Sequence, residues 1–360
     1  MRIRAERDDL GDVFARANRA IGARSALPVL QGLLCEAEAG TLKVTGTDLE
    51  MTVRTKAAVE VLEEGSAVIP GKLLEQAVRR MPGGVVTIGT SDSDVEIIGK
   101  GPRFNLRQLA RDDFPKLDDT VPAGTEVDGE ALAVAIAQVT SAASGDAARP
   151  ILTGVLFEAS DDGVRLVATD SYRLAVRDLP GLGIESSALI PARGLRELAR
   201  TVGSSKVSVS LDGRESIFSS ERGSLHLRLI EGTFPKYRSL LPDQYPNEVL
   251  VEKEALLEAL GRVSLVAEDH IPVRLTLSKG GVDVAVTRQD VGGEAEHLAG
   301  EFSGTAEEVA IAFNPRYLQD GVAAVSGERI RIQVIDGLKP SVISSSHDST
   351  FLYLLMPVRV

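Results

Sequence analysis

The stretch VRLVATDSYRLAV (164–176) repeats a pattern that occurs earlier as LKVTGTDLEMTV (42–53). In both stretches alternating apolar residues run into a Thr-Asp pair, a short interruption follows, and the alternation resumes. This pattern is typical of two strands joined by a tight turn. Aspartate favours such a turn because its side chain accepts hydrogen bonds from nearby backbone amides. The two Thr-Asp pairs lie 122 positions apart, which indicates a long internal repeat.

Three further pairs of segments recur in the same order, with offsets between 120 and 122 positions. They are SAVIPGKLLEQAVRRM (66–81) with SALIPARGLRELARTV (187–202), LQGLLCEAEAGTLKV (30–44) with LTGVLFEASDDGVRL (152–166), and RDDFPKL (111–117) with EGTFPKY (231–237). A weaker third copy is present in PVRLTLSKGGVDVAVTRQD (272–290) and VAIAFNPRYLQDGVAAV (309–325). The period exceeds the roughly 20–50 residues of solenoid repeats, so each copy is predicted to be a domain. We place the three domains at 1–121, 122–245 and 246–360.

Each copy is predicted to combine two helices with several short strands. RDDLGDVFARANRAIG (7–22) places Leu10, Phe14 and Ala17 at helical spacing, with acidic residues in the first turn. Equivalent first helices are predicted at 129–143 and 252–267. A second helix follows a strand that ends in proline or Asn-Pro, and strands with Gly or Asp-Gly turns fill the rest. The fold class is therefore α+β, repeated three times.

The composition of the 360-residue chain indicates a folded protein with a net charge of −12. This charge disfavours nonspecific attraction to nucleic acid or anionic membranes, although a locally basic surface remains compatible with it. Cys35 is the single cysteine, so no intrachain disulfide is expected and a cytoplasmic location is predicted. The N-terminal MRIRAERDDLGDVF lacks the apolar run of a signal peptide, and no membrane association is expected.

The sequence carries no motif of a familiar enzyme or metal site. GSAVIPGKLL (65–74) has the wrong spacing for a phosphate-binding loop, with Leu73 at the position that needs Ser or Thr. The four histidines are scattered and no cysteine cluster occurs, so no metal and no cofactor are predicted. The alternative function is a duplicated β-rich hydrolase that uses Asp48 or Asp170 for acid-base chemistry. Turn formation is the favoured interpretation of these two residues.

Basic residues recur on the predicted second helices of the first two copies. Each of these helices has an excess of two positive charges, against the negative charge of the whole chain. This recurrence favours a surface that contacts the phosphates of a polyanion without reading its bases, since aromatic residues are not interleaved. The basic residues predicted to form this phosphate-contacting surface are Arg24, Lys72, Arg79, Arg80, Arg149, Arg193, Arg196 and Arg200.

The chain resembles the bacterial sliding-clamp family, the beta subunit of the replicative DNA polymerase III. The residues that carry this resemblance span the whole chain: ALPVLQGLL (26–34), VTGTDLEM (44–51), VATDSYRLAV (167–176), FPKYRSLLP (234–242), AFNPRYL (312–318) and YLLMPVRV (353–360). The resemblance implies three clamp domains per chain and a head-to-tail homodimer that forms a ring around duplex DNA. It implies a non-catalytic processivity factor that keeps the polymerase close to its template. A nucleoid-associated location in the cytoplasm follows from this role.

The resemblance also implies the partners and the sites they use. The partners are double-stranded DNA, a second copy of the chain, and the DNA polymerase III alpha subunit, clamp loader, other DNA polymerases and repair proteins, which dock through short linear motifs. The implied peptide pocket comprises Leu152, Thr169, Ser171, Tyr172, Arg173, Leu174, Pro235, Leu240, Asn314, Tyr317, Ser341, Leu354, Met356, Pro357, Val358 and Arg359. Leu174 and Leu354 fit core packing equally well. The predicted dimer interface pairs Phe104 and Leu106 with Leu265 and Val266 of the second copy.

The C-terminal segment YLLMPVRV is apolar where chain ends are usually polar. Tyr353–Leu355 is predicted to form a closing strand. Pro357 cannot donate to a strand ladder, so the chain is predicted to leave the sheet at Met356 and form a wall of the pocket.

Overall fold

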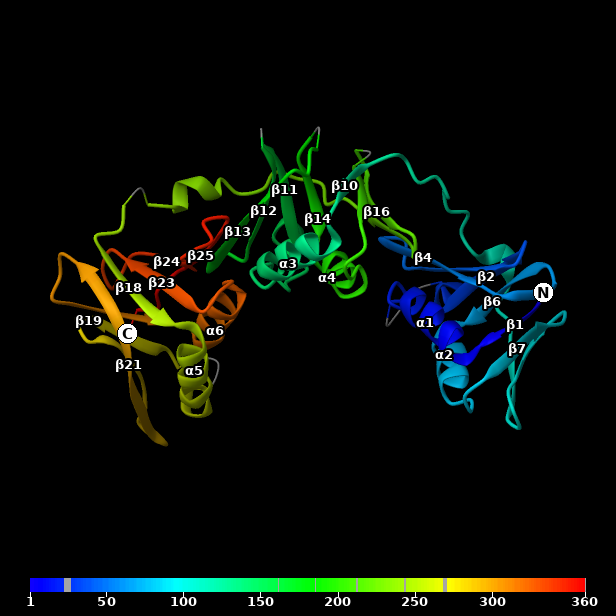
Figure 1. The fold of residues 1–360 in the computed structure, drawn as a ribbon, viewed down its shortest axis with the longest axis horizontal. Coiled ribbons are helices and arrows are strands. Elements are labelled where there is room, and N and C mark those ends of the chain that lie inside the picture. Colours follow the sequence, from blue (N-terminus) through cyan, green and yellow to red (C-terminus); the bar gives the residue numbers. More distant parts are fainter. Residues whose placement is uncertain are drawn as a thin grey trace. The chain divides into compact units, whose positions relative to one another are not determined.

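The structure is a computed structural model that describes residues 1–22, 27–160, 162–184, 186–211, 213–242, 244–267 and 271–359. Its backbone contacts divide the chain into two compact units (Figure 1). Unit 1 comprises Met1–Glu130 and Arg200–Leu229, and unit 2 comprises Ala131–Ala199 and Ile230–Val360. The middle repeat is shared between them. The boundaries near 121 and 245 stay a prediction.

Unit 1 contains two antiparallel sheets among its described residues. A five-stranded sheet has the order β5-β1-β7-β8-β9, and an eight-stranded sheet has the order β10-β15-β16-β17-β4-β3-β2-β6. The strands are β1 (Arg2–Glu6), β2 (Gly32–Glu38), β3 (Thr41–Thr47), β4 (Met51–Ala58), β5 (Glu60–Glu63), β6 (Gly65–Pro70), β7 (Val85–Thr90), β8 (Asp94–Ile98), β9 (Arg103–Arg107), β10 (Thr125–Val127), β15 (Val207–Leu211), β16 (Glu215–Ser220) and β17 (Gly223–Arg228). The eight-stranded sheet joins the first repeat to the middle one through the β4–β17 pair.

Unit 2 contains one antiparallel sheet of twelve strands, in the order β14-β11-β12-β13-β25-β24-β23-β18-β21-β20-β19-β22. These are β11 (Gly154–Ser160), β12 (Gly163–Thr169), β13 (Arg173–Pro180), β14 (Ala188–Pro191), β18 (Asn247–Glu252), β19 (Val273–Ser278), β20 (Gly281–Arg288), β21 (Gly292–Gly304), β22 (Glu308–Phe313), β23 (Arg329–Val334), β24 (Ser341–Ser345) and β25 (Phe351–Leu355). The β13–β25 pair joins the middle repeat to the third.

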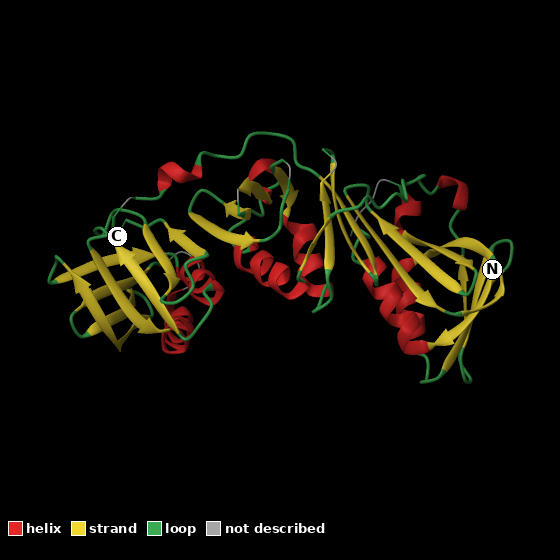
Figure 2. Ribbon diagram, turned by 45° about the horizontal axis from the view of Figure 1, so that its top comes forward, coloured by secondary structure: helices red, strands yellow, loops and turns green. Residues whose placement is uncertain are grey.

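The described residues form six α-helices, two for each sequence repeat, as predicted. They are α1 (Arg7–Asn18), α2 (Gly71–Arg79), α3 (Gly129–Thr140), α4 (Ala192–Thr201), α5 (Lys253–Ala267) and α6 (Pro315–Ala324). Within unit 1, α1 packs beside α2 and against β3 and β4. Within unit 2, α5 packs beside α6 and against β20 and β21 (Figure 2). The prediction of an α+β fold is confirmed.

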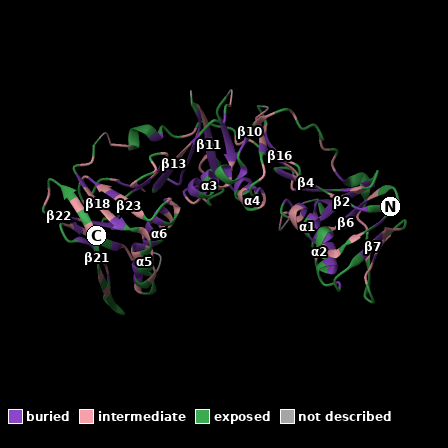
Figure 3. Cartoon of the chain, in the orientation of Figure 1, coloured by how far each residue is buried: buried purple, intermediate pink, exposed green. Residues whose placement is uncertain are grey.

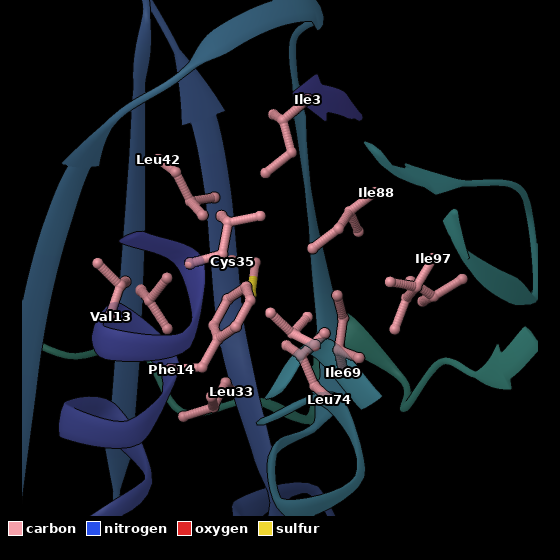
Figure 4. Close-up of a cluster of buried hydrophobic side chains, with 14 of the residues drawn as sticks. Ile3, Val13, Phe14, Leu33, Cys35, Leu42, Ile69, Leu74, Ile88 and Ile97 are labelled. Atoms are coloured by element: carbon pink, nitrogen blue, oxygen red, sulfur yellow. The ribbon is translucent and has the colours of Figure 1, made fainter. Parts of the chain in front are cut away.

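The core of unit 1 shows why the apolar spacing of the first helix matters. Phe14 of α1 lies among buried side chains that include Leu33 of β2, Ile69 of β6 and Leu74 of α2 (Figure 4). Burying one such side chain stabilises the fold by roughly 1.5–3 kcal/mol. Asp8 and Asp9 lie in the first turn of α1, where the positive end of the helix dipole stabilises their negative charge.

The repeated Thr-Asp pairs are turn residues, as the sequence indicated. The Asp48 carboxylate accepts hydrogen bonds from the amides of Glu50 and Met51, at 3.1 and 2.8 Å. The Asp170 carboxylate accepts them from the equivalent amides of Tyr172 and Arg173, at 2.9 and 3.1 Å. The residue after each aspartate has a positive φ, 74° at Leu49 and 83° at Ser171. The two turns therefore have the same geometry.

The predicted closing strand at the C-terminus is confirmed. β25 ends at Leu355, and the Met356 amide donates to the Tyr172 carbonyl at 2.9 Å. Two residues later, the Val358 amide donates to the Ala312 carbonyl at 2.8 Å. The segment after β25 is thus held against β22 and the turn that precedes β13.

Candidate nucleic-acid and partner-binding sites

The predicted DNA-binding cations that the structure describes are all exposed. Unit 1 carries Lys72 and Arg79 on α2, Arg80 directly after it, and Arg200 near the end of α4. Figure 3 shows α2 with a buried face and exposed positions beside it. Unit 2 carries Arg149 at the start of a short 3₁₀ helix and Arg193 and Arg196 on α4. Arg24 lies outside the described residues.

The packing between α1 and α2 positions the cations of unit 1. Gly11 of α1 has no side chain, and a Cβ there would lie 3.8 Å from Cγ of Arg79. Glu75 pairs with Arg79 at 3.0 Å and accepts a hydrogen bond from Asn18 at 2.7 Å. Lys72 has no carboxylate partner in the described part of unit 1. An exposed cation without a carboxylate partner is available to a phosphate.

The predicted pocket residues divide into an exposed rim and a buried group within unit 2. The exposed members are Ser171, Tyr172, Pro235, Leu240, Met356, Val358 and Arg359, and the partly buried ones are Leu152, Asn314, Tyr317 and Pro357. The buried members are Thr169, Arg173, Leu174, Ser341 and Leu354. Leu174 and Leu354 belong to an apolar cluster with Val167, Val176, Tyr237 and Val342. Core packing therefore describes these two residues.

A buried arginine connects three elements beneath the rim. Arg173 pairs with Asp170 at 2.9 Å and with Asp320 of α6 at 2.6 Å. It also donates to the Tyr353 hydroxyl at 3.2 Å, and its guanidinium lies 4.2 Å from the ring centroid of Tyr317. A buried charge is tolerated when it is paired and hydrogen-bonded in this way. The network fixes α6 and β25 against the turn that precedes β13.

The Tyr172 ring extends this network to the surface. It stacks on Tyr317 with ring centroids 6.3 Å apart and is 58% exposed. The Asn314 side chain caps α6 by accepting from the Tyr317 amide at 3.1 Å, which fixes the start of that helix. The rim therefore presents an aromatic face stacked on Tyr317, and the exposed Met356 is bonded to Tyr172 through its amide. Such a surface suits apolar peptide side chains.

The wall that carries Pro235 and Leu240 is attached through Glu158 of β11. The Arg238 guanidinium donates to both Glu158 oxygens, at 2.9 and 2.6 Å, and the Tyr237 hydroxyl donates at 2.7 Å. The hydrogen bonds from Arg238 hold the pKa of Glu158 below its ordinary value, against partial burial, which would raise it. Burial, followed by the hydrogen bond to Glu158, raises the pKa of Tyr237 to about 12.

Replacing Glu158 with Gln should loosen this wall. Because Arg238 is exposed, we expect a loss of about 0.5–1 kcal/mol, so amides 237–241 should exchange roughly 2–5 times faster at pH 7. Since the folded pKa of Glu158 is lowered, its contribution is present above the ordinary value of 4.5 and is lost as pH falls through the folded pKa. Hydrogen exchange measures both effects. Glu231→Gln is the control, and equal exchange in the two variants would contradict the assignment.

Sequence patterns alone did not identify the residues that organise the pocket. Glu158, Arg238 and Asp320 are far apart in the chain, and no motif connects them. Asp320 lies three residues after Tyr317 in α6. This spacing indicates a helix and does not indicate that Asp320 pairs with an arginine of a distant strand. In the Arg-Leu-Ala-Val strand after Asp170, alternation places Arg173 on the face opposite Leu174 and Val176, so the pattern did not mark this arginine as buried.

Catalytic chemistry finds no support in the geometry. The Asp48 and Asp170 carboxylates accept turn amides, and Asp170 is also paired with Arg173. Among the described residues, no group of three or more His, Cys, Asp or Glu side chains could hold a metal ion. Within the same residues, none of the helices is long and apolar enough to cross a bilayer.

Three sequence repeats, each with two helices and several strands, carry exposed cations on α2 and α4 and an exposed apolar rim in unit 2. Family models for the DNA polymerase III beta subunit match the N-terminal domain at 1–118, the central domain at 126–236 and the C-terminal domain at 238–359. The chain therefore belongs to the DNA polymerase III beta subunit family. The proteins of this family are non-catalytic processivity factors that bind DNA and polymerase.

Individual relatives agree with this assignment. The chain is 34% identical over 376 residues to the beta sliding clamp of Streptomyces coelicolor, with 100% of each chain covered. It is 38% identical over 290 residues to that of Micrococcus luteus, covering 78% of this chain and 93% of the relative. A DnaN sliding clamp from Bartonella birtlesii bound to griselimycin has a TM-score of 0.92 and 28% identity, with 100% of each chain covered. The Thermotoga maritima beta subunit has a TM-score of 0.91 and 25% identity, covering 100% of this chain and 99% of that one.

Proposed function

We propose that two copies of the chain close into a ring around duplex DNA and tether the DNA polymerase III alpha subunit to its template. Family membership supports the clamp activity. The exposed cations Lys72, Arg79, Arg80, Arg149, Arg193, Arg196 and Arg200, with Arg24, would contact phosphates without reading sequence. Clamp loader, other polymerases and repair proteins would use the pocket rim. The three domains would lie at 1–121, 122–245 and 246–360, and the ring would act in the cytoplasm on nucleoid DNA.

The observation that carries the ring is a pair of strand edges without partners. At both internal junctions, a hairpin strand of one repeat pairs with the last strand of the next: β4 with β17, and β13 with β25. Two strands occupy the corresponding positions in the outer repeats. They are β9, the last strand of the first repeat, and the first half of β21, a hairpin strand of the third repeat. In the described part of the chain, β9 pairs only with β8, and residues 292–296 pair only with β20. A second copy would supply each missing partner.

The internal junctions also predict the register of the pairing between chains. The β3–β4, β12–β13 and β20–β21 hairpins have equivalent pairs at their open ends, Thr41↔Ala58, Gly163↔Pro180 and Gly281↔Ala299. Counting back five residues along each second strand makes Val53, Ala175 and Glu294 equivalent. The Leu109 amide donates to the Val68 carbonyl and the Ile230 amide to the Leu189 carbonyl, and Val68 and Leu189 are equivalent in the repeat. Leu109 and Ile230 are therefore equivalent, and so are Phe104 and Leu225, five residues earlier. Val53 pairs with Leu225 and Ala175 with Tyr353. The proposed interchain pairs are therefore Phe104↔Glu294 and Leu106↔Gly292.

The predicted apolar partners lie close to these edges. Arg262 of α5 pairs with Glu296 of β21 at 2.7 Å, which ties the helix to the free half of that strand. Leu265, one turn further along α5, is 84% exposed. Phe104 is exposed and Val266 is partly buried. A large apolar side chain with this exposure marks a surface that a second chain would cover.

The function is tested by loading the full-length protein onto nicked circular DNA with its ATP-dependent loader. A topological clamp should remain on the circle at high salt and slide off after the circle is cut. Release from the intact circle at the same rate would contradict encirclement.

Phosphate contact is tested separately by the salt dependence of weak binding to a short duplex. Removing one contact should reduce the slope of log K against log salt by about 0.9. We expect this reduction for Lys72→Ala and for Arg80→Ala, measured by fluorescence anisotropy at low salt. Lys56→Ala, which removes an exposed cation from β4, is the control. Slopes that match the unmodified protein would remove these residues from the DNA-contacting surface.

A further inference from the structure

A groove of about 510 Å³ follows the outer edge of β22, the last strand of the twelve-stranded sheet. Its floor and walls combine backbone, apolar side chains and two arginines. The lining residues are Arg274, Ala310, Ile311, Ala312, Gly337, Leu338, Val358 and Arg359. Only Val358 and Arg359 also belong to the predicted peptide pocket. The groove is thus a neighbour of that pocket along the C-terminal segment.

The two arginines give the groove a positive charge in a chain whose net charge is −12. Arg274 and Arg359 are exposed, and neither forms an ion pair with a carboxylate in the part of the chain that the structure describes. The nearby Asp336 uses one carboxylate oxygen to accept from the amides of Leu338 and Lys339, at 2.7 and 3.0 Å. Lys339 adds a third exposed cation beside the groove. Electrostatics therefore favour an occupant with carboxylates.

The outer edge of β22 is covered by two neighbouring segments of the chain. β22 pairs on one side with β19, in the register Arg274↔Ala312. Because the Ala312 carbonyl accepts from Val358 outside this ladder, the backbone groups of Ala312 and Ala310 point to the outer edge. A Cβ at Gly337 would approach the Ala310 carbonyl to 2.5 Å, so only glycine lets the loop lie this close to the edge. The edge is therefore framed by the loop and the C-terminal segment.

Apolar side chains complete the surface. Leu338 is 70% exposed, and the hydrogen bonds from its own amide and that of Lys339 to Asp336 hold it in this position. Val358 is exposed on the other side of the groove. A peptide in an extended conformation places alternate side chains on opposite sides, so its acidic and apolar side chains can reach different walls of the groove. Duplex DNA would not use an apolar wall.

We propose that this groove binds an extended peptide segment that alternates acidic and apolar residues and belongs to a protein that docks in the neighbouring pocket. The carboxylates pair with Arg274 and Arg359, and the apolar side chains lie against Leu338 and Val358. The assignment of the segment to a docking partner rests on the proposed function of the pocket. The groove itself does not. Two linked contacts would raise the affinity of the partner through effective concentration.

The probe is a fluorescein-labelled nonapeptide of alternating Glu and Leu, measured by anisotropy against the full-length protein. A Kd on the order of 100 µM is expected for a contact this small. Arg274→Glu should weaken binding at least tenfold. Lys279→Glu makes the same charge change in the turn directly after β19 and should leave binding unchanged. A Lys-Leu nonapeptide should not bind the unmodified protein.

The remaining outcomes separate the groove from the pocket. Leu240→Asp alters the pocket wall outside the groove, so binding of the Glu-Leu peptide should persist while polymerase stimulation falls. If Leu240→Asp abolishes peptide binding and Arg274→Glu does not, the peptide occupies the pocket and the groove proposal is wrong. Absence of binding, or equal competition by a ten-nucleotide single strand, would also overturn it. Retained polymerase stimulation in Leu240→Asp would count against the pocket alone.

Discussion

Replacing both Phe104 and Leu106 with arginine is expected to convert the dimer into a folded monomer. Each side chain would bury apolar surface against a second chain, contributing roughly 2 kcal/mol, and the arginines would place charge in that contact. A loss of about 4 kcal/mol raises the dissociation constant nearly 1000-fold at one interface, and the ring contains two. Sedimentation equilibrium at micromolar concentration measures the change. Leu62→Arg, on β5 at the opposite edge of the same sheet, is the control.

A disulfide test addresses the register of the same interface. Arg54 pairs with Ser224 at the internal junction, so the equivalent residues Ala295 and Arg103 should face each other between chains. Cysteines at 103 and 295 should form a covalent ring, while cysteines at 105 and 295 should react slowly because they are two positions out of register. Burial raises the pKa of the Cys35 thiol, so the native cysteine does not compete. A stable monomer of the unmodified chain, or equal yields for the two pairs, would contradict the proposed ring.

The repeat was predictable because its strongest markers are local. A Thr-Asp turn uses its own side chains, so the same few residues give the same hydrogen bonds at Asp48 and Asp170. Helix spacing is also local, and it predicted α1 and α5 to within a few residues. The resemblance of the longer motifs then indicated the sliding-clamp family. The three matching family models establish that the chain belongs to it.

The pocket was less predictable because burial depends on tertiary packing. Leu174 is apolar in a strand, and periodicity alone does not distinguish the floor of a pocket from the core beneath it. The structure places it in the core. Arg173 precedes it in the same strand and reaches Asp320, 147 positions away, which no local pattern encodes. The groove at β22 depends equally on Gly337 lying against Ala310, a contact that only the fold creates.

Deleting residues 356–360 should abolish partner docking without opening the ring. β25 ends at Leu355, so the deletion leaves its ladder with β13 and β24 intact. Among the backbone hydrogen bonds of the described residues, it removes those from Met356 to Tyr172 and from Val358 to Ala312. It also removes the exposed Met356 side chain, whose backbone amide is bonded to Tyr172. We expect a folded dimer that still encircles DNA, as judged by its melting temperature and by retention on nicked circles.

The loss should appear in peptide affinity and polymerase stimulation. A motif peptide that binds with roughly micromolar affinity has about −8 kcal/mol of binding free energy, and losing one apolar wall removes a few kcal/mol of it. Binding should therefore weaken at least 100-fold, and stimulation of the polymerase should disappear. Met356→Asp with Val358→Asp keeps both backbone hydrogen bonds and should reproduce most of the loss, because the apolar side chains carry the contact. If the truncated protein binds the peptide as tightly as the full chain, the C-terminal segment is not a wall of the docking site, and the pocket must lie elsewhere in unit 2.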